Sequence, residues 1–408
     1  MSKKIFYGWW IVLACFIVSF YFGGVVFYSF TAFFEPIREE FGWSYAQISL
    51  ATSLRGLEMG ILAPLVGFLV DRFGSRKIIL CGTVTVGLGL ITLSMTQSLF
   101  MFYMAFVLLA FGAGGCTSVV TMTVVTNWFH KRLGLALGIM VSGFGAGGLL
   151  VPVIVKFITL YGWRNTLVIL GIGIWVLGVP MAFVIRDSPE KYGCLPDGLE
   201  SLPSDLGAKE EPDDKDWAFK EVIKKKGFWY LNLTEAVRMV VLTSVVIHVM
   251  PYLSDLGFER SVGGFVAAGI PLISILGRFG FGWFSDFFDK RYVMAAAFCF
   301  MAAGMVAFRF INGTGLVMLF LFLYSPGIGG GMVLRGAILK KYFGRQSFGK
   351  LLGITLGSAS IGGIIGPTIA GWAFDVLGSY DIVWSGFCVL LAVSIIFIMR
   401  IKGSAENY

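Results

Sequence analysis

The side chains with the greatest chemical potential in this sequence are charged groups inside long apolar runs. Arg278 lies in the run 261–285, eight residues before Asp286, which puts it about 12 Å inside the run at 1.5 Å of helix per residue. Arginine stays charged there, and its planar guanidinium matches a carboxylate in two parallel hydrogen bonds. An ionised group at membrane depth is costly and therefore a functional candidate. Arg278 predicts an anion site, with a structural ion pair as the alternative.

Three titratable residues are candidates for carrying a proton. Glu235 lies at nearly the same depth as Arg278, although Arg238 three residues later is an alternative, structural partner. His248 is of a type that titrates near neutrality, and a neutral, hydrogen-bonded histidine is the competing interpretation. Asp255 lies at the end of the same run, at least roughly 20 Å from Arg278 along straight helices. The residues alone leave the choice among Glu235, His248 and Asp255 open.

Catalytic and cofactor-binding patterns are missing from the sequence. The histidines are His130 and His248, which give a histidine-based metal site or a serine triad little to build on. A phosphate-binding Gly-x-x-x-x-Gly-Lys-Ser/Thr loop is absent, so ATP is not the expected energy source. We expect no enzyme activity, no cofactor and no metal. A membrane-embedded enzyme and a transport-dead sensor remain the alternatives from other classes.

The elements that position these groups are membrane-spanning helices. Of 408 residues, 57% are hydrophobic and 14% are charged, against about 25% charged in ordinary soluble domains. Apolar runs of 20 or more residues recur along the chain, and each is long enough to cross roughly 30 Å of hydrocarbon as a helix. The six cysteines imply no disulfide framework. The sequence therefore predicts an all-α polytopic membrane protein in contact with a lipid bilayer.

The net charge of +8 reports topology rather than a nucleic-acid partner. Lys and Arg residues cluster in short segments between apolar runs, at 3–4, 72–77, 131–132, 224–226, 290–291, 340–345 and 400–402. Positive residues favour the cytoplasmic side, so both termini are expected there, which requires an even number of crossings. We expect a multi-pass protein of the inner (plasma) membrane.

Twelve helices are predicted, in two groups of six. They lie at about 8–34, 45–70, 78–98, 100–128, 134–160, 164–185, 228–253, 261–285, 292–311, 315–340, 350–374 and 381–400. The long polar stretch 186–227, with four prolines and an acidic cluster, reads as a cytoplasmic linker. The expected organisation is an N-terminal bundle (1–185), the linker (186–227) and a C-terminal bundle (228–408).

An internal repeat supports the two groups. Gly67 and Asp71 recur 215 residues later as Gly282 and Asp286. The same displacement relates further pairs: Gly134 and Gly349, Gly138 and Gly353, Gly148 and Gly363, Pro152 and Pro367. Halves repeated in the same orientation are a transporter architecture with the substrate between them. Arg278 has Ala63 as its counterpart, so this cation belongs to one half only.

Several segments resemble known transporters. The segment from Gly67 through Asp71, Arg72 and Arg76 to Lys77 closely resembles the cytoplasmic loop signature of the major facilitator superfamily. Within that superfamily, four further segments resemble the monocarboxylate transporters and their bacterial relatives, which include oxalate and formate exchangers. These segments are Tyr7–Trp10, Asn127–Gly138, Asp187–Gly198 and His248–Phe258. The resemblance implies two six-helix bundles related by pseudo-two-fold symmetry.

The resemblance also implies roles for particular residues. Arg278 matches the helix-8 arginine that is taken to bind the substrate carboxylate in this group. Animal members have Asp at the position of Ser274 and a proton-linked lysine where Tyr28 aligns, so the proton path must differ here. Tyr28 and Tyr324 fall on helices that line the central cavity, and with Ser274 and Arg278 they form the predicted substrate site. The predicted cytoplasmic gate consists of Asp71, Arg72, Arg76, Asp286 and Arg291.

These observations predict a secondary active transporter. A single intramembrane arginine favours one carboxylate per substrate. The expected function is proton-coupled symport of a small monocarboxylate such as lactate or pyruvate by alternating access, with the proton gradient as energy source. The alternative is an exchanger of carboxylate anions. The expected partners are the substrate, protons and the bilayer, and we expect the protein to function as a monomer.

Overall fold

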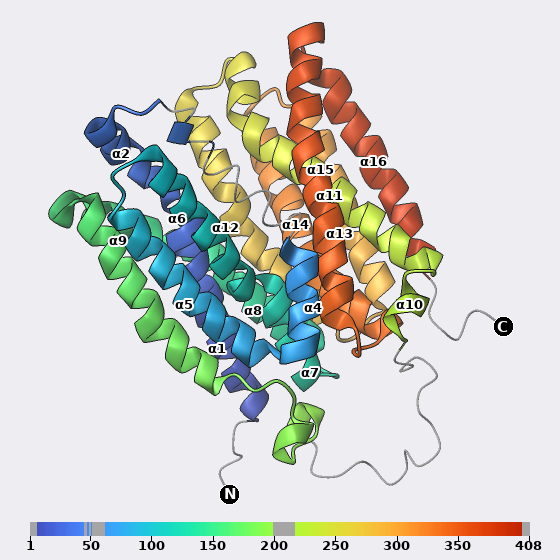
Figure 1. Ribbon diagram of the computed structural model, residues 1–408. Helices are drawn as coiled ribbons and strands as arrows, with labels where there is room; N and C mark the ends of the chain where they lie inside the picture. Colours follow the sequence, from blue (N-terminus) through green and yellow to red (C-terminus); the bar gives the residue numbers. More distant parts are fainter. Residues whose placement is uncertain (1–5, 45–46, 49, 51–61, 199–216, 402–408) are drawn as a thin grey trace, which may run out of the picture. The chain divides into compact units, whose positions relative to one another are not determined.

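A computed structural model describes residues 6–44, 47–48, 50, 62–198 and 217–401. Contacts within the chain divide it into two units, Met1–Lys131 with Ile139–Ser204 and Arg132–Gly138 with Asp205–Tyr408. We call them the first and the second unit. The elements of the described residues are helices, drawn in chain order in Figure 1.

Ten helical stretches of the described residues are long and apolar enough to cross a membrane. One of them, Leu133–Val184, has 52 residues and is interrupted at Gly162, where φ is 77° and ψ is 160°. It therefore holds the two crossings predicted at 134–160 and 164–185. The crossing predicted at 45–70 is described as a helix from Ala63 onward, and most of its earlier part lies outside the described residues. The predicted class, an all-α polytopic membrane protein, is confirmed.

The first unit contains most of the N-terminal helices. Its elements are α1 (Tyr7–Phe22), η1 (Gly23–Tyr28), η2 (Phe30–Phe33), α2 (Phe34–Phe41), α4 (Ala63–Phe73), α5 (Ser75–Ser94), α6 (Leu99–Cys116), α7 (Ser118–Trp128), α8 (Leu133–Ala146), η4 (Gly147–Leu150), α9 (Val151–Val184), η5 (Glu190–Tyr192) and η6 (Pro196–Gly198). The first turn of α8 is grouped with the second unit. Helix α5 packs along both α6 and α9 (Figure 1).

The second unit contains the remaining helices. They are α10 (Phe219–Val222), α11 (Lys226–Asp255), α12 (Arg260–Phe284), α13 (Lys290–Arg309), α14 (Thr314–Phe343), α15 (Phe348–Leu377) and α16 (Asp381–Met399). Helix α14 packs against both α12 and α13, while α11 packs along α15 (Figure 1). The predicted boundaries agree with these helices to within a few residues.

Glycines allow α14 to approach its neighbours closely. A Cβ on Gly329 would lie 3.0 Å from the backbone nitrogen of Arg278 on α12. On Gly327 it would lie 2.6 Å from the side chain of Met301 on α13. Small residues at such crossings let helix backbones meet in a membrane, where helix association depends on close packing. This packing brings the polar residues of α11, α12 and α14 together inside the second unit.

Candidate functional site

A buried ion pair on α11 is the starting point of the site. Arg238 donates to Glu235 through Nη2 at 2.8 Å and through Nε at 3.2 Å to each carboxylate oxygen. The side chains are 1% and 0% exposed. Residues three apart on a helix lie on the same face. Arg238 is therefore a structural partner of Glu235, which was the alternative interpretation in the sequence analysis. Glu235 is the one Asp or Glu among the buried residues of the described segments.

Arg335 on α14 makes the pair into a cluster. Its Nη1 lies 3.6 Å from Oε2 of Glu235, and its side chain is 4% exposed. The sequence prediction did not include Arg335, which stands a few residues before the basic residues Lys340 and Lys341. The same depth argument would have found it, since it lies eight residues before Phe343, the end of α14, or about 12 Å of helix.

Arg278 lies at the edge of this group. It is 3% exposed and interacts electrostatically with Arg335. We call Glu235, Arg238, Arg278 and Arg335 the ionic cluster. Arg238 and Arg335 contact the carboxylate of Glu235, and Arg278 lies near Arg335. Two further buried arginines therefore accompany Arg278, which weakens the argument from a single arginine for a substrate with one carboxylate.

Tyr324 on α14 and a guanidinium nitrogen of Arg238 on α11 add hydrogen-bond donors to the ionic cluster. Tyr324, Gly331 and Arg335 are spaced by seven and four residues and so share one face of α14. Gly331 leaves room for Arg238, whose Cδ would lie 2.7 Å from a Cβ there. Tyr324 interacts electrostatically with Arg238. The Tyr324 hydroxyl and Arg238 Nη1 are buried without a hydrogen-bond partner in the described structure, so each has a donor available.

The other two predicted substrate residues differ in surroundings. Ser274 on α12 is 1% exposed, and its hydroxyl donates to the carbonyl of Pro271 at 2.7 Å, which leaves it able only to accept. Tyr28 ends η1 in the first unit, with its ring 5.3 Å from that of Phe27 and 5.6 Å from that of Phe144. Arg278, Ser274 and Tyr324 all lie in the second unit, and Tyr28 belongs to the first.

The predicted proton carriers are spread along α11. Only Glu235 belongs to the ionic cluster. His248, thirteen residues later and about 20 Å along the helix, lies 3.1 Å from both the Tyr380 hydroxyl and the Pro367 carbonyl. The carbonyl can only accept, so Nε2 carries hydrogen and Nδ1 accepts from Tyr380 in the neutral ring. Burial raises the pKa of Tyr380, which keeps that hydroxyl a donor. Asp255 is exposed at the end of α11.

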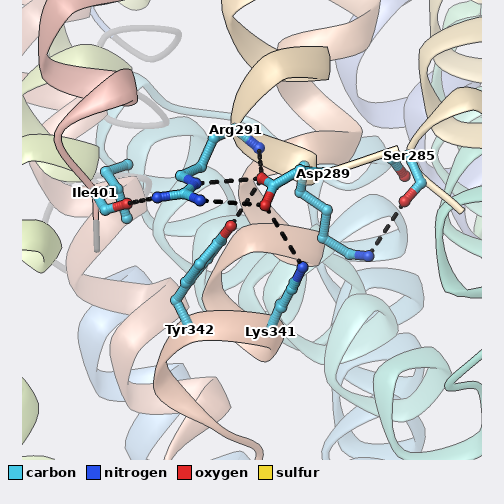
Figure 2. A network of polar contacts seen from close by, with 7 residues as sticks. Ser285, Asp289, Arg291, Lys341, Tyr342 and Ile401 are labelled. Atoms are coloured by element: carbon cyan, nitrogen blue, oxygen red, sulfur yellow. Dashed lines mark hydrogen bonds and ion pairs between the residues drawn. The ribbon is translucent and has the colours of Figure 1, made fainter. Parts of the chain in front are cut away.

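The predicted gate residues of the second unit bind within that unit. Asp286 accepts hydrogen bonds from the backbone nitrogens of Gly134 at 2.6 Å and Leu135 at 3.0 Å, in the segment grouped with this unit. Arg291 donates to Asp289 and, through Nη1 at 3.0 Å, to the carbonyl of Ile401 (Figure 2). Arg291 thus joins the start of α13 to the chain beyond α16.

The predicted gate residues of the first unit are also accounted for by local contacts. The backbone nitrogen of Arg76 donates to Asp187 at 2.9 Å, and its guanidinium lies 5.2 Å from the ring centre of Phe183. Arg72 is exposed, with its guanidinium 5.4 Å from the ring centre of Phe73. Asp71 is half-buried beside it at the end of α4. A gating role for Asp71, Arg72 and Arg76 stays a prediction.

The described residues contain no group of three or more His, Cys, Asp or Glu side chains that could hold a metal ion. The six cysteines are free thiols. What the second unit offers is instead a candidate anion site, built from buried guanidinium groups and the Tyr324 phenol. Such groups bind and orient a ligand without changing its bonds.

Comparison with known proteins identifies the family. The sequence matches the Major Facilitator Superfamily over residues 10–277 and again over 236–406. The chain belongs to the major facilitator superfamily. The two overlapping matches fit a chain of two related halves. The predicted family is therefore confirmed, and the chain is a multi-pass membrane transporter rather than an enzyme.

Curated relatives include monocarboxylate transporters. The chain is 24% identical to monocarboxylate transporter 12 of Xenopus laevis, over 97% of this chain and 89% of that protein. It is 25% identical to monocarboxylate transporter 4 of Gallus gallus, over 93% and 79% of the two chains. An uncharacterized MFS-type transporter, YcxA of Bacillus subtilis, is 25% identical over 91% and 88%.

Solved structures share the fold. The outward conformation of the transporter FucP has a TM-score of 0.72 at 15% identity, covering 95% of this chain and 98% of that one. The proton:xylose symporter XylE has a TM-score of 0.75 at 13% identity, covering 97% and 96%. These matches establish the major facilitator fold for the chain.

Proposed function

We propose that this transporter carries a small monocarboxylate such as lactate or pyruvate together with a proton, by alternating access. The observation that carries the proposal is the ionic cluster of the second unit, in which the buried Arg278 accompanies two arginines that contact Glu235. A guanidinium offers two parallel donors to a carboxylate, and burial strengthens that interaction. A carboxylate substrate would therefore bind at Arg278.

The relatives support the substrate class and the coupling. Two of the curated relatives named above are monocarboxylate transporters, which fits a carboxylate site built on arginine. Two proteins of the same fold are described as a fucose:proton and a proton:xylose symporter, so this fold supports coupling to protons. The distribution of Lys and Arg supports our proposal that both termini are cytoplasmic. We also propose that the protein acts as a monomer in the plasma membrane.

Uptake into proteoliposomes tests the substrate site. Wild-type protein should give saturable uptake of radiolabelled lactate, and Arg278→Gln should reduce it to the level of protein-free liposomes. Arg309→Gln is the matched control, because Arg309 is a second-unit arginine whose partner is Asp381, at 2.7 Å, at the start of α16. The control should keep most of the uptake. Wild-type uptake by Arg278→Gln would show that the site is assigned wrongly.

Exchange of carboxylate anions is the second candidate. The arginines of the ionic cluster favour exchange because they can bind an outgoing carboxylate as well as an incoming one. An inward proton gradient without any lactate gradient should drive accumulation by a symporter. An exchanger would accumulate labelled lactate only in liposomes preloaded with a counter-anion.

A further inference from the structure

Two arginines flank the membrane crossing that ends α9, which runs from the break at Gly162 to Val184. Arg164 lies in its first turn, and Arg186 lies just beyond its end, 22 residues later in the sequence. At 1.5 Å per residue the two are about 33 Å apart, close to the roughly 30 Å of a hydrocarbon core. Each arginine therefore lies near a membrane surface, at opposite ends of one helix.

The guanidinium group of Arg164 is bound by the protein itself. It donates through Nη2 to the carboxylate of Glu40 at 2.6 Å and through Nη1 to the carbonyl of Ser94 at 2.5 Å. It also lies 4.5 Å from the ring centre of Trp163. Arg164 thus combines an aromatic contact with acceptors for its hydrogen-bond donors.

Arg186 has aromatic contacts without those acceptors. Its guanidinium carbon lies 4.2 Å from the ring centre of Tyr7 and 4.3 Å from that of Tyr192. Among the described residues the guanidinium has no hydrogen bond and no ion pair, because Trp128 binds only the backbone carbonyl of Arg186. Aromatic rings attract a guanidinium over their faces, whereas its five N–H donors point outward in its own plane. The donors of Arg186 are therefore available for a ligand.

The acidic residues close to Arg186 in sequence do not neutralise it. Asp187 accepts a hydrogen bond from the backbone nitrogen of Arg76 at 2.9 Å, so its carboxylate faces the start of α5. Asp197 accepts from two backbone nitrogens of the loop after α7, both at 3.0 Å. Neither carboxylate, nor that of the exposed Glu190, forms an ion pair with Arg186 in the described structure.

Local structure fixes both aromatic rings beside Arg186. The Tyr7 hydroxyl donates to the carbonyl of Val184 at 2.9 Å, which ties the start of α1 to the end of α9. Tyr192 ends the short helix η5, and the left-handed turn at Gly193, with φ of 67°, ends that helix directly after it. A planar guanidinium held between fixed groups loses little freedom when it binds an anion.

We propose that Arg186, with Tyr7 and Tyr192, forms a binding site for the phosphate group of an anionic lipid headgroup. Arginine binds phosphate through two parallel hydrogen bonds. The Tyr192 residue is 42% exposed, and tyrosine is enriched where membranes meet water. A bilayer holds lipid phosphates at this depth, which favours them over free inorganic phosphate as the ligand. The site belongs to the first unit and is independent of the substrate proposed above.

Photolabelling of the full chain in nanodiscs tests the site. The probe is phosphatidylglycerol with a small photoreactive group on its headgroup, and mass spectrometry locates the adducts. Wild type should be labelled at the peptides that carry Tyr7 and Tyr192. Arg186→Gln should lower that yield at least about tenfold, because charge-assisted hydrogen bonds are lost. Adducts elsewhere on the chain should keep their yield and serve as the internal reference.

Lys191→Gln is the matched control, since it removes the same charge from an exposed residue of η5. Its yield should stay within about twofold of wild type, because solvent and salt screen an exposed charge. Arg186→Lys covers the case in which Arg186→Gln does not fold. Lysine keeps the charge but lacks the planar fork, so the yield should fall about threefold. Circular dichroism of each variant in detergent checks folding.

Competition with unlabelled compounds identifies the source of the phosphate. Excess phosphatidylglycerol should displace the probe, and inorganic phosphate at the same concentration should leave the labelling unchanged. Displacement by inorganic phosphate as readily as by the lipid would identify free phosphate as the ligand and overturn the lipid assignment.

Three further outcomes would overturn the inference. They are wild-type labelling that spares the peptides carrying Tyr7 and Tyr192, unchanged labelling of a folded Arg186 variant, and an equal loss in Lys191→Gln and the Arg186 variant. The last result would mean that lipids are attracted by the positive surface in general. Uptake measured with Arg278→Gln is unaffected by any of them, so a failure here is distinguishable from a failure of the proposed function.

Discussion

Four positions of the repeated frame distinguish the two units chemically. The second unit buries charged side chains there, Glu235, Arg238, Arg278 and Arg335. The first unit has uncharged residues 215 positions earlier, Phe20, Gly23, Ala63 and Val120. The repeat thus maintains helices and their crossings, while at these four positions the charged residues occur in the second half alone.

The ends of the helices show the opposite relation. Each unit has a junction between a helix end and the segment after its last helix, and the two junctions are built from different side chains. In the first unit, Trp128 donates to the carbonyl of Arg186 at 2.8 Å, and Asp187 accepts from the backbone of Arg76. In the second unit, Arg291 donates to the carbonyl of Ile401, which lies 215 residues after Arg186. Both junctions tie a helix end to the segment that follows the unit's last helix. Trp128 ends α7 whereas Arg291 lies at the start of α13, so the two corresponding carbonyls accept from different helices.

Replacing a charged residue of the ionic cluster by an uncharged one, as at the corresponding positions of the first unit, should have the largest effect on stability. Arg238→Met leaves the buried Glu235 with its more distant cation alone. Breaking a buried ion pair on one side costs about 3–5 kcal/mol. We expect the free energy of unfolding to fall by about 3 kcal/mol, at the lower end of that range because Arg335 remains. The measurement is denaturant unfolding of the purified protein in detergent.

The double variant Glu235→Leu with Arg238→Met is the control for that loss. It removes both charges of the pair and brings this face close to the apolar character of Phe20 and Gly23 in the first unit. Stability should rise by about 1–2 kcal/mol over Arg238→Met but stay below wild type, because the unpartnered carboxylate is gone while Arg335 has lost Glu235. A double variant less stable than Arg238→Met would mean that the loss of Glu235 by Arg335 outweighs the removal of the unpartnered carboxylate.

Gly331 offers a smaller change at the same place. Its counterpart in the first unit is Cys116, which has a Cβ. In the second unit a Cβ would lie 2.7 Å from Cδ of Arg238. Gly331→Ala should cost about 1–3 kcal/mol through overpacking and should weaken lactate exchange by displacing Arg238. Thermal unfolding and the exchange assay measure the two effects.

Gly264→Ala is the matched control, since a Cβ there would meet nothing within 4 Å on α12 of the same unit. It should change stability by no more than about 0.5 kcal/mol and leave exchange intact. Equal effects at Gly331 and Gly264 would mean that Arg238 moves aside without consequence, and would weaken its assignment as the structural partner of Glu235.

The helical frame was predictable from the sequence because it depends on local patterns. Apolar runs long enough to span a bilayer predicted helices at 228–253 and 350–374, where the structure has Lys226–Asp255 and Phe348–Leu377. The depth of Arg278 and the spacing of Glu235 and Arg238 also follow from the helical rise and period alone. These predictions needed no knowledge of which helices are neighbours.

The composition of the ionic cluster was not predictable in the same way, because it depends on contacts between helices. Arg335 is 100 residues from Glu235 in sequence, and only the packing of α11 against α14 brings them to 3.6 Å. Similarly, nothing local shows that Arg291 contacts Ile401, or that His248 contacts Tyr380. A repeat comparison that searched for unmatched cations, rather than matched glycines, would have found Arg335.

The two junction aspartates should differ in strength. Asp289 accepts from the backbone of Arg291 and from the Tyr342 hydroxyl, both at 2.8 Å, and lies 3.8 Å from Nζ of Lys341 (Figure 2). Asp187 accepts one backbone hydrogen bond at the start of α5. Asp289→Ala should cost about 2 kcal/mol and Asp187→Ala about 1 kcal/mol. Thermal unfolding compares them, and equal losses would contradict the view that the second junction has the stronger acceptor.

Acid sensitivity should show the smallest difference between the units. In the first unit, the hydrogen bond from Arg164 holds the pKa of Glu40 below its usual range, although burial opposes it. In the second, partial burial raises the pKa of Asp289, but hydrogen bonds from Arg291 and Tyr342 outweigh it and the pKa is lowered. A lowered pKa means that each carboxylate stabilises the fold above its unfolded pKa, about 4.3 for Glu and 3.9 for Asp. That contribution is lost as the pH falls through the folded pKa.

We therefore expect the stability of wild type to fall between about pH 4.5 and pH 3, and the fall to be shallower in Glu40→Gln and in Asp289→Asn. The Glu40 side chain is 42% exposed and that of Asp289 is 25% exposed. Solvent screens the more exposed pair, which should contribute below about 1 kcal/mol. The change in slope should thus be larger for Asp289→Asn. Melting temperatures measured across this pH range would contradict the assignment if Glu40→Gln flattened the curve more than Asp289→Asn, because the pair of Glu40 and Arg164 would then be the stronger one.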